Sequence, residues 1–284
     1  MKKSFLLLLL LLYCNFSPAV QAQLLYRLDS KNGSHISYIY GTIHMMPEDK
    51  FSIPEPLRRA FSSCGMIAME VDLNMDLATK IEMAKQTILP EGKTLQDITS
   101  PEQYQLIYQY CVDSNGMSKK KFKKYSRLKP FFLSSVMLQE DLKKTKSYEL
   151  EFAEMAKKEA KKTMGLESVQ LQLETINTVS LNDQVSLLIE GFSSEINYDH
   201  MLTNYLAENL DFLYSDIIKE SNSFPNFVEN FLNKRNRNWI PVIENQIDIE
   251  NTFIAVGAGH LPGENGILAL LRNKGYTLTP IPLK

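Results

Sequence analysis

The sequence has 284 residues, a formal net charge of −2 and a hydrophobic content of 44%. This length and composition are those of a globular protein with enough apolar residues for a sizeable core. The nearly balanced charge lacks the basic excess of nucleic-acid-binding proteins, so we expect no nucleic-acid partner.

The first 22 residues have the pattern of a secretory signal peptide. Residues 1–3 form a basic segment with two lysines, residues 5–12 are apolar, and residues 20–22, which include the small residues Val20 and Ala22, precede a predicted cleavage site before Gln23. The apolar run is too short to form a membrane-spanning helix. We therefore expect this segment to be removed during export.

The mature chain, residues 23–284, is expected to form a single domain with a net charge of −4, because cleavage removes Lys2 and Lys3. No later stretch is apolar enough to span a bilayer. Anchoring as a lipoprotein would use Cys14, but the tyrosine before it fits that pattern poorly. We predict an exported protein, periplasmic or extracellular, without a transmembrane helix in the mature chain.

The first convincing strand leads into a glycine and a histidine. Residues 24–28 and 36–40 fit the two strands of a hairpin. Immediately afterwards, two residues separate Gly41 from His44. A glycine allows a sharp turn of the backbone, and the histidine then lies at a strand end, where open α/β sheets place their ligands.

A helix over residues 54–63 and a strand over residues 66–72 would complete a βαβ unit. The strand is a nearly continuous apolar run, as in a parallel sheet covered on both faces, and it contains Glu70. A buried carboxylate is costly unless it is paired, hydrogen-bonded or bound to a metal. Glu70 is therefore either a structural ion pair or a site residue. Asp72 shares its face, and we interpret it as a helix cap.

Residues from about 73 to 250 are predicted to form a large, mostly helical insert. Within it, a short extended segment at residues 162–168 carries Glu167, which could serve a site or begin the next helix. Farther along, Arg235 and Asn236 could clamp a carboxylate or a carbonyl oxygen. The alternative for this pair is an exposed, charged helix face.

A second buried strand, residues 251–256, ends as the first one does, since two residues separate Gly257 from His260. A helix at residues 264–273 and a strand at residues 276–281 close the chain. We predict an α/β (α+β) fold in which the N- and C-terminal segments form a mixed sheet. Helices pack on this sheet, the helical insert joins its two halves, and both glycine–histidine turns belong to it.

Cleavage of the signal peptide leaves two cysteines, Cys64 and Cys111. An oxidising compartment would permit a disulfide, but the sequence does not give the distance that one requires. Two buried, unpaired cysteines are the alternative. No CxxC motif supports thiol chemistry.

Two neutral imidazoles and a carboxylate are a suitable ligand set for a divalent metal with an open coordination position. On this interpretation His44, His260 and Glu70 hold an ion that activates water for hydrolysis. A carboxylate, Glu167 or Glu70, accepts a proton, and Arg235 stabilises an anionic intermediate. The alternative is a structural role for the two histidines.

Five segments, in this order, resemble the TraB/PrgY/GumN family: Gly41-Thr42-Ile43-His44, Met69-Glu70-Val71-Asp72, Gly165-Leu166-Glu167 with Gln170, Arg235-Asn236 with Trp239, and Gly257-Ala258-Gly259-His260-Leu261. The resemblance covers nearly all of the mature chain. It implies similarity to Tiki-like metalloproteases and a fold akin to the erythromycin-esterase and ChaN-like superfamily.

Carried over by position, the resemblance implies that His44, His260 and Glu70 bind a divalent ion such as manganese, cobalt or zinc. Glu167, Arg235 and Asn236 match further family segments, and we assign them, with Glu70, to the catalytic machinery. We predict an exported metal-dependent hydrolase, a peptidase acting on a peptide or protein. The alternatives are a non-catalytic peptide-binding or regulatory protein and a protein that binds haem or another cofactor.

Overall fold

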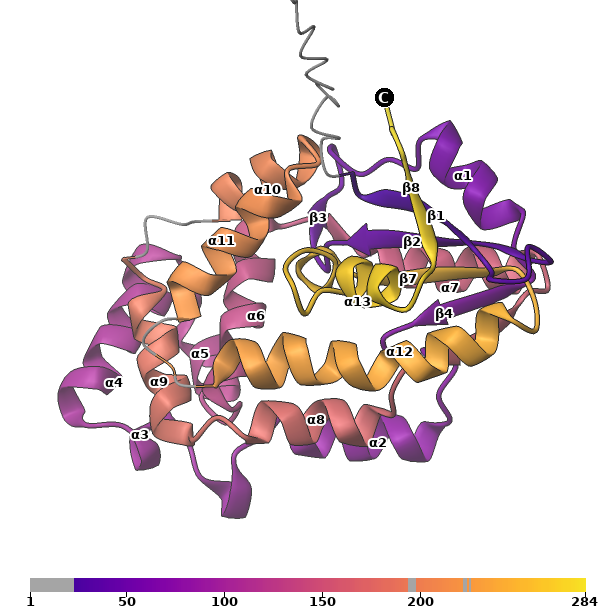
Figure 1. The fold of residues 1–284 in the computed structure, drawn as a ribbon. Coiled ribbons are helices and arrows are strands. Elements are labelled where there is room, and N and C mark those ends of the chain that lie inside the picture. Colours follow the sequence, from indigo (N-terminus) through magenta and orange to yellow (C-terminus); the bar gives the residue numbers. More distant parts are fainter. Residues whose placement is uncertain (1–22, 194–197, 222–223, 225) are drawn as a thin grey trace, which may run out of the picture.

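The computed structural model describes residues 23–193, 198–221, 224 and 226–284. The predicted signal peptide, residues 1–22, lies outside the described residues. In the described part, helices surround one central sheet, and a group of short helices extends to one side of it (Figure 1).

The central sheet has six strands in the order β6-β4-β7-β2-β1-β8. The strands are β1 (Leu25–Asp29), β2 (Ile36–Thr42), β4 (Met66–Met69), β6 (Lys162–Gly165), β7 (Thr252–Gly257) and β8 (Thr277–Ile281). β2, β7, β4 and β6 run parallel, while β1 is antiparallel to β2 and β8. The predicted mixed sheet is confirmed, and β6 adds a strand from the middle of the chain. Two short strands, β3 (Met46–Pro47) and β5 (Thr145–Lys146), pair separately.

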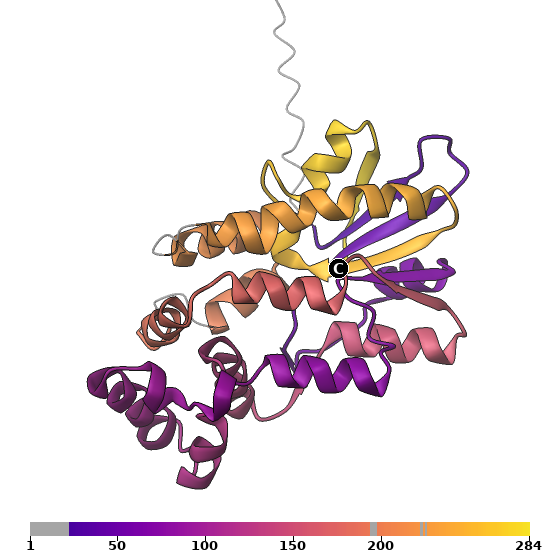
Figure 2. The ribbon, with the colours of Figure 1, turned by 90° about the horizontal axis from the view of Figure 1, so that it is seen from below.

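Helices make up most of the chain between β4 and β7. The α-helices are α1 (Glu55–Ser62), α2 (Leu77–Gln86), α3 (Leu95–Ile98), α4 (Pro101–Tyr108), α5 (Lys119–Tyr125), α6 (Pro130–Leu142), α7 (Tyr148–Lys158), α8 (Val169–Asn177), α9 (Leu181–Glu190), α10 (Tyr198–Leu206), α11 (Leu210–Ser221), α12 (Lys234–Ile247) and α13 (Ile267–Asn273). Figure 2 shows α12 and α13 on one side of the sheet and α7 on the other. Within the described ranges, none of the helices combines the length and apolarity needed to cross a membrane.

Helix starts follow the capping residues in the sequence. α4 begins after Ser100, whose side chain accepts from the amide of Gln103 while the Gln103 side chain accepts from the amide of Ser100. α2 is capped by Asp76, whose carboxylate accepts from the amide of Thr79. Asp72, which we expected to cap this helix, instead accepts from the amide of Asn74 and from the hydroxyl of Thr163 in β6. The difference arises because α2 begins only at Leu77, with Asp76 at the N-cap position.

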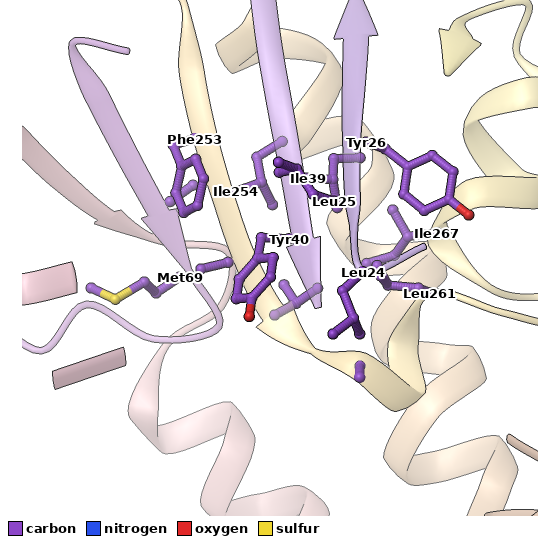
Figure 3. Packing of buried hydrophobic residues seen from close by; sticks show 14 of the residues in the cluster. Leu24, Leu25, Tyr26, Ile39, Tyr40, Met69, Phe253, Ile254, Leu261 and Ile267 are labelled. Atoms are coloured by element: carbon purple, nitrogen blue, oxygen red, sulfur yellow. The ribbon is translucent and has the colours of Figure 1, made fainter. Parts of the chain in front are cut away.

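Aromatic side chains form the centre of the core beneath the sheet. Phe152 from α7 lies 5.0 Å from Phe253 of β7 and 5.5 Å from Phe61 of α1, measured between ring centroids. Tyr40 of β2 packs on the same group, and Figure 3 shows it beside Phe253. All four side chains are almost fully buried. This packing fixes β2 and β7, whose ends carry the two histidine turns.

The two cysteines belong to different hydrophobic clusters. Cys64 is buried in the main core, whereas Cys111 lies in a smaller cluster formed by the short helices α3–α6 and α9. Both thiols are free, and burial raises the pKa of each to about 12. The alternative of two buried, unpaired cysteines is the one that the structure shows.

The end of β6 requires a glycine because the loop that follows β4 lies against it. A Cβ atom at Gly165 would approach the backbone nitrogen of Asp72 to 2.8 Å and the carbonyl oxygen of Glu167 to 2.7 Å. Backbone atoms on both sides leave little room for adjustment. The close approach brings the residues after β4 and β6 together.

We expect Gly165→Ala to lower the free energy of unfolding by about 1–3 kcal/mol, because the added methyl group overpacks this contact. Gly191→Ala is the matched control, since a Cβ atom there would make only ordinary contacts of 3.4 and 3.5 Å. Urea unfolding of both variants measures the difference. Equal stability of the two variants would contradict the assigned packing.

Candidate functional site

The candidate site lies at the edge of the sheet where four parallel strands end. Along this edge the neighbours are β6, β4, β7 and β2. Each strand is followed within three residues by one predicted site residue, in the same order: Glu167, Glu70, His260 and His44. Parallel pairing therefore brings together residues that are far apart in the sequence.

The two histidine turns pack directly against each other. A Cβ atom at Gly41 would approach the Cα atom of Ala258 to 3.1 Å and the side chain of Leu261 to 2.9 Å. The absence of a side chain at Gly41 therefore lets the turn after β2 approach the turn after β7.

Glu70 is buried, with 7% of its surface exposed, and several polar groups surround its carboxylate. One oxygen accepts from the amide of Gly257 at 2.8 Å, and the other from Arg235 at 2.6 Å and Gln172 at 3.2 Å. Burial alone would raise the pKa of Glu70, but the charges of His260, which is protonated only at acidic pH, and of Arg235 lower it to about 2. Glu70 is therefore an anion at neutral pH.

Arg235 of α12 connects both carboxylates of the site. Its Nη2 donates to Glu70 and to Glu167, at 2.6 Å in each case, and its Nε donates to Glu167 at 3.0 Å. The second Glu167 oxygen accepts from the indole nitrogen of Trp239 at 3.1 Å, and that ring stacks under the guanidinium. Although burial opposes the charged form, the two carboxylates raise the pKa of Arg235 overall. These contacts leave Glu167 almost inaccessible to solvent, at 2% side-chain exposure.

His260 is held as a neutral imidazole in one tautomer. Its Nδ1 donates to the side-chain oxygen of Asn236 at 2.6 Å, which leaves the lone pair on Nε2. That atom lies 3.2 Å from Nη1 of Arg235 and 3.8 Å from the carboxylate of Glu70. Burial lowers the pKa of His260 to about 4, so it is unprotonated at neutral pH. Asn236 is fixed in turn by the carbonyl groups of His260 and Asn265.

His44 is exposed, with 69% of its side chain accessible, and it contacts a residue that we did not predict. Its Nδ1 lies 3.1 Å from the carboxylate of Glu149, which also accepts from the hydroxyls of Thr42 at 2.5 Å and Ser147 at 2.6 Å. The hydrogen bond to Glu149 raises the pKa of His44 to about 9 despite the opposing effect of desolvation. The charges of Glu70 and Arg235 also act on His44, although neither group contacts it.

The structure thus brings five of the six predicted site residues into one connected network: Glu70, Glu167, Arg235, Asn236 and His260. His44 lies at the same edge but pairs with Glu149. Across the described ranges, no group of three or more His, Cys, Asp or Glu side chains is arranged so that it could hold a metal ion. Of the three predicted metal ligands, two approach each other closely, namely Glu70 and His260.

Two polar residues of the site were absent from the sequence prediction. Glu149 lies in the first turn of the helix α7, and the alternating charges of residues 148–162 are typical of an exposed helix face. Gln172 lies in α8, two residues beyond a glutamine that the family resemblance included. No local signal distinguishes Gln172 from a surface residue. The only signal for Glu149 was indirect: the hydroxyl of Thr42, in the histidine turn, is a donor that needs an acceptor.

The chain belongs to the TraB/PrgY/gumN family, whose sequence model matches residues 24–280. It is 23% identical to Metalloprotease TIKI1 of Danio rerio over 87% of this chain and 61% of that protein. Metalloprotease TIKI2 of Xenopus tropicalis is 22% identical over 87% of this chain and 58% of the relative. Metalloprotease TIKI1 of Homo sapiens is 22% identical, with 87% and 60% covered. The chain spans about three fifths of the length of these relatives. No solved structure is significantly similar to it.

Arg235 is expected to dominate the stability of the site. Arg235→Met leaves Glu70 and Glu167 buried without their cation and should lower the free energy of unfolding by about 3–5 kcal/mol. Arg237→Met is the control on the same helix, because that arginine pairs with Glu229 at the exposed surface and should cost about 1 kcal/mol or less. Denaturant unfolding of both variants measures the contrast. A similar loss in both would contradict the central role of Arg235.

Proposed function

We propose that the protein is an exported metal-dependent hydrolase that cleaves peptide bonds. The observation that carries this proposal is the buried pair of Glu70 and His260, an ionised carboxylate and a neutral imidazole whose Nε2 atom lies 3.8 Å from it. Family membership supports it, because the similar TIKI proteins are named metalloproteases. Export rests on the signal-peptide pattern of residues 1–22.

The donor chemistry of the site fits a divalent ion. Glu70 and His260 supply two of the ligand types that such ions take in hydrolases, and Asn236 fixes the ring of His260 as outer ligands of metal sites do. His44 is the third proposed ligand, because it lies at the same edge of the sheet. It would bind the ion after losing the proton that its contact with Glu149 stabilises. When bound, the ion would supply Lewis-acid activation of water and of a carbonyl group. Manganese, cobalt and zinc are the ions that we would test first.

We propose that Glu167 orients Arg235 and that Arg235 stabilises a negatively charged intermediate. Glu167 accepts from both Arg235 and Trp239 and has almost no solvent exposure, so it positions the guanidinium. This differs from our sequence-based assignment of Glu167 as a proton acceptor. Arg235 places fixed positive charge beside Glu70 and His260, where a negatively charged intermediate would develop. Its Nη1 also donates to the carbonyl of Phe231, so the guanidinium stays anchored if its contact with His260 is exchanged for an ion.

Metal content tests the proposal directly. We expect roughly one divalent ion per chain after reloading with zinc, manganese or cobalt, and its loss in folded His44→Ala and His260→Ala. His35→Ala is the control, since His35 precedes β2 at the opposite end of that strand from Gly41. Elemental analysis and circular dichroism give the two readouts.

Peptidase activity should follow the metal in the same preparations. Turnover of a peptide library by the loaded protein, abolished in His44→Ala and retained in His35→Ala, is the expected result. Failure of the reloaded wild-type protein to retain any of the three ions would rule out the metallohydrolase. Metal retention without turnover of any peptide would favour a binding protein instead.

Glu149 should set the orientation of His44. Glu149→Gln removes the carboxylate charge but keeps its size, and we expect metal affinity and activity to fall about 10- to 100-fold while the fold is retained. Glu154→Gln, at an exposed position of the same helix, is the control. Isothermal titration with zinc measures the affinity. Unchanged affinity in Glu149→Gln would show that the contact with His44 has no part in metal binding.

A further inference from the structure

Glu208 is a buried carboxylate that the proposed hydrolytic site does not use. It follows α10, and only 8% of its surface is exposed. Its backbone adopts the left-handed conformation, with φ of 57°, which is unfavourable for a residue with a side chain. Burying a carboxylate is also costly without a compensating cation. Among the described residues, however, no ion pair involves Glu208.

The polar contact of Glu208 lies at the start of the predicted mature chain. Its Oε2 accepts from the backbone amide of Leu24 at 3.2 Å. The amide nitrogen of Gln23 precedes that of Leu24 by three backbone bonds, which corresponds to about 3 Å. It donates to the hydroxyl of Tyr26 at 3.1 Å, and the side-chain oxygen of Gln23 is buried without a hydrogen bond in the described part of the chain. The nitrogen of Gln23 thus lies close to a buried anion.

We propose that Glu208 is the binding site for the α-ammonium group that cleavage after Ala22 creates on Gln23. The exporting cell's signal peptidase would hydrolyse the Ala22–Gln23 bond: water supplies the carboxylate oxygen of Ala22, and the released amine of Gln23 takes up a proton. A neutral amide nitrogen thereby becomes a cation beside Glu208. The pairing supplies the positive charge that the buried carboxylate otherwise lacks.

The same contact connects the new terminus to the candidate site. Leu24 is buried, and its carbonyl oxygen accepts from the amide of Gly41 at 2.8 Å. The hydroxyl of Tyr205, whose charge environment includes Glu208, donates to the carbonyl of Gly41 at 2.9 Å. Gly41 begins the turn that carries His44. Capture of the terminus by Glu208 therefore fixes the backbone from which the first histidine turn begins. The inference uses the predicted cleavage and does not depend on hydrolytic activity.

A double-mutant cycle tests the pairing, with each protein expressed from the full-length precursor and exported. An alanine inserted between Ala22 and Gln23 moves the ammonium group one residue away, and Glu208→Gln removes the anion. We expect each change alone to lower Tm by about 2–4 °C and the combination to cause little further loss, because both remove the same ion pair. Glu154→Gln, at an exposed position, should leave Tm unchanged with and without the insertion.

Mass spectrometry of the purified proteins supplies a second readout. The wild-type protein should begin at Gln23 and keep its α-amine, whereas Glu208→Gln should lose ammonia faster as the released amine cyclises onto the Gln23 side chain. Cyclisation is compared between the wild-type protein and Glu208→Gln, because the insertion variant begins with alanine and has no N-terminal glutamine to cyclise. Strictly additive Tm losses, a mature terminus other than Gln23, or equal cyclisation rates would each overturn the proposal.

Discussion

The guanidinium of Arg235 is the group on which the candidate site depends. Two carboxylates, Glu70 and Glu167, are buried at neighbouring strand ends, where burying a carboxylate without a compensating cation is costly. Arg235 contacts both at 2.6 Å and rests on the ring of Trp239. Because this arginine belongs to α12, the same contacts join the edge of the sheet to the helix that covers it. The contacts that hold the site together therefore also hold α12 against the sheet.

The parallel strands determine which residues can meet at this edge. β7 comes near the end of the chain but lies between β4 and β2, which come near its beginning. His260 is consequently placed next to Glu70, and its turn contacts the turn that carries His44. The antiparallel strands β1 and β8 continue the sheet on one side without contributing residues to the network. Their contribution is indirect, since β1 and the residue before it hold β2 and Gly41 in position.

Much of this edge could be predicted because its signals are local. An apolar run that ends in glycine marks a buried strand and its turn, so His44 and His260 were placed correctly at strand ends, and the isolated carboxylate in such a run identified Glu70. Glu149 could not be predicted, because it is 107 residues from Thr42 and its helix has the alternating charges of a solvated surface. Glu149 is shielded from solvent because of the way α7 packs in the folded protein, which the sequence pattern does not reveal. The close contact of Arg235 with His260 could likewise not be predicted, since nothing in the sequence indicates which face of α12 packs toward the sheet.

The most direct measurement of the proposed metal centre is anomalous diffraction from crystals of the protein loaded with manganese or zinc. We expect one strong anomalous peak within coordination distance of the His260 Nε2 atom and a Glu70 oxygen, with His44 turned toward it. Its absence from crystals of the His260→Ala variant would complete the assignment. An ion bound only elsewhere, with Arg235 still filling the space between His260 and Glu70, would contradict the proposed centre.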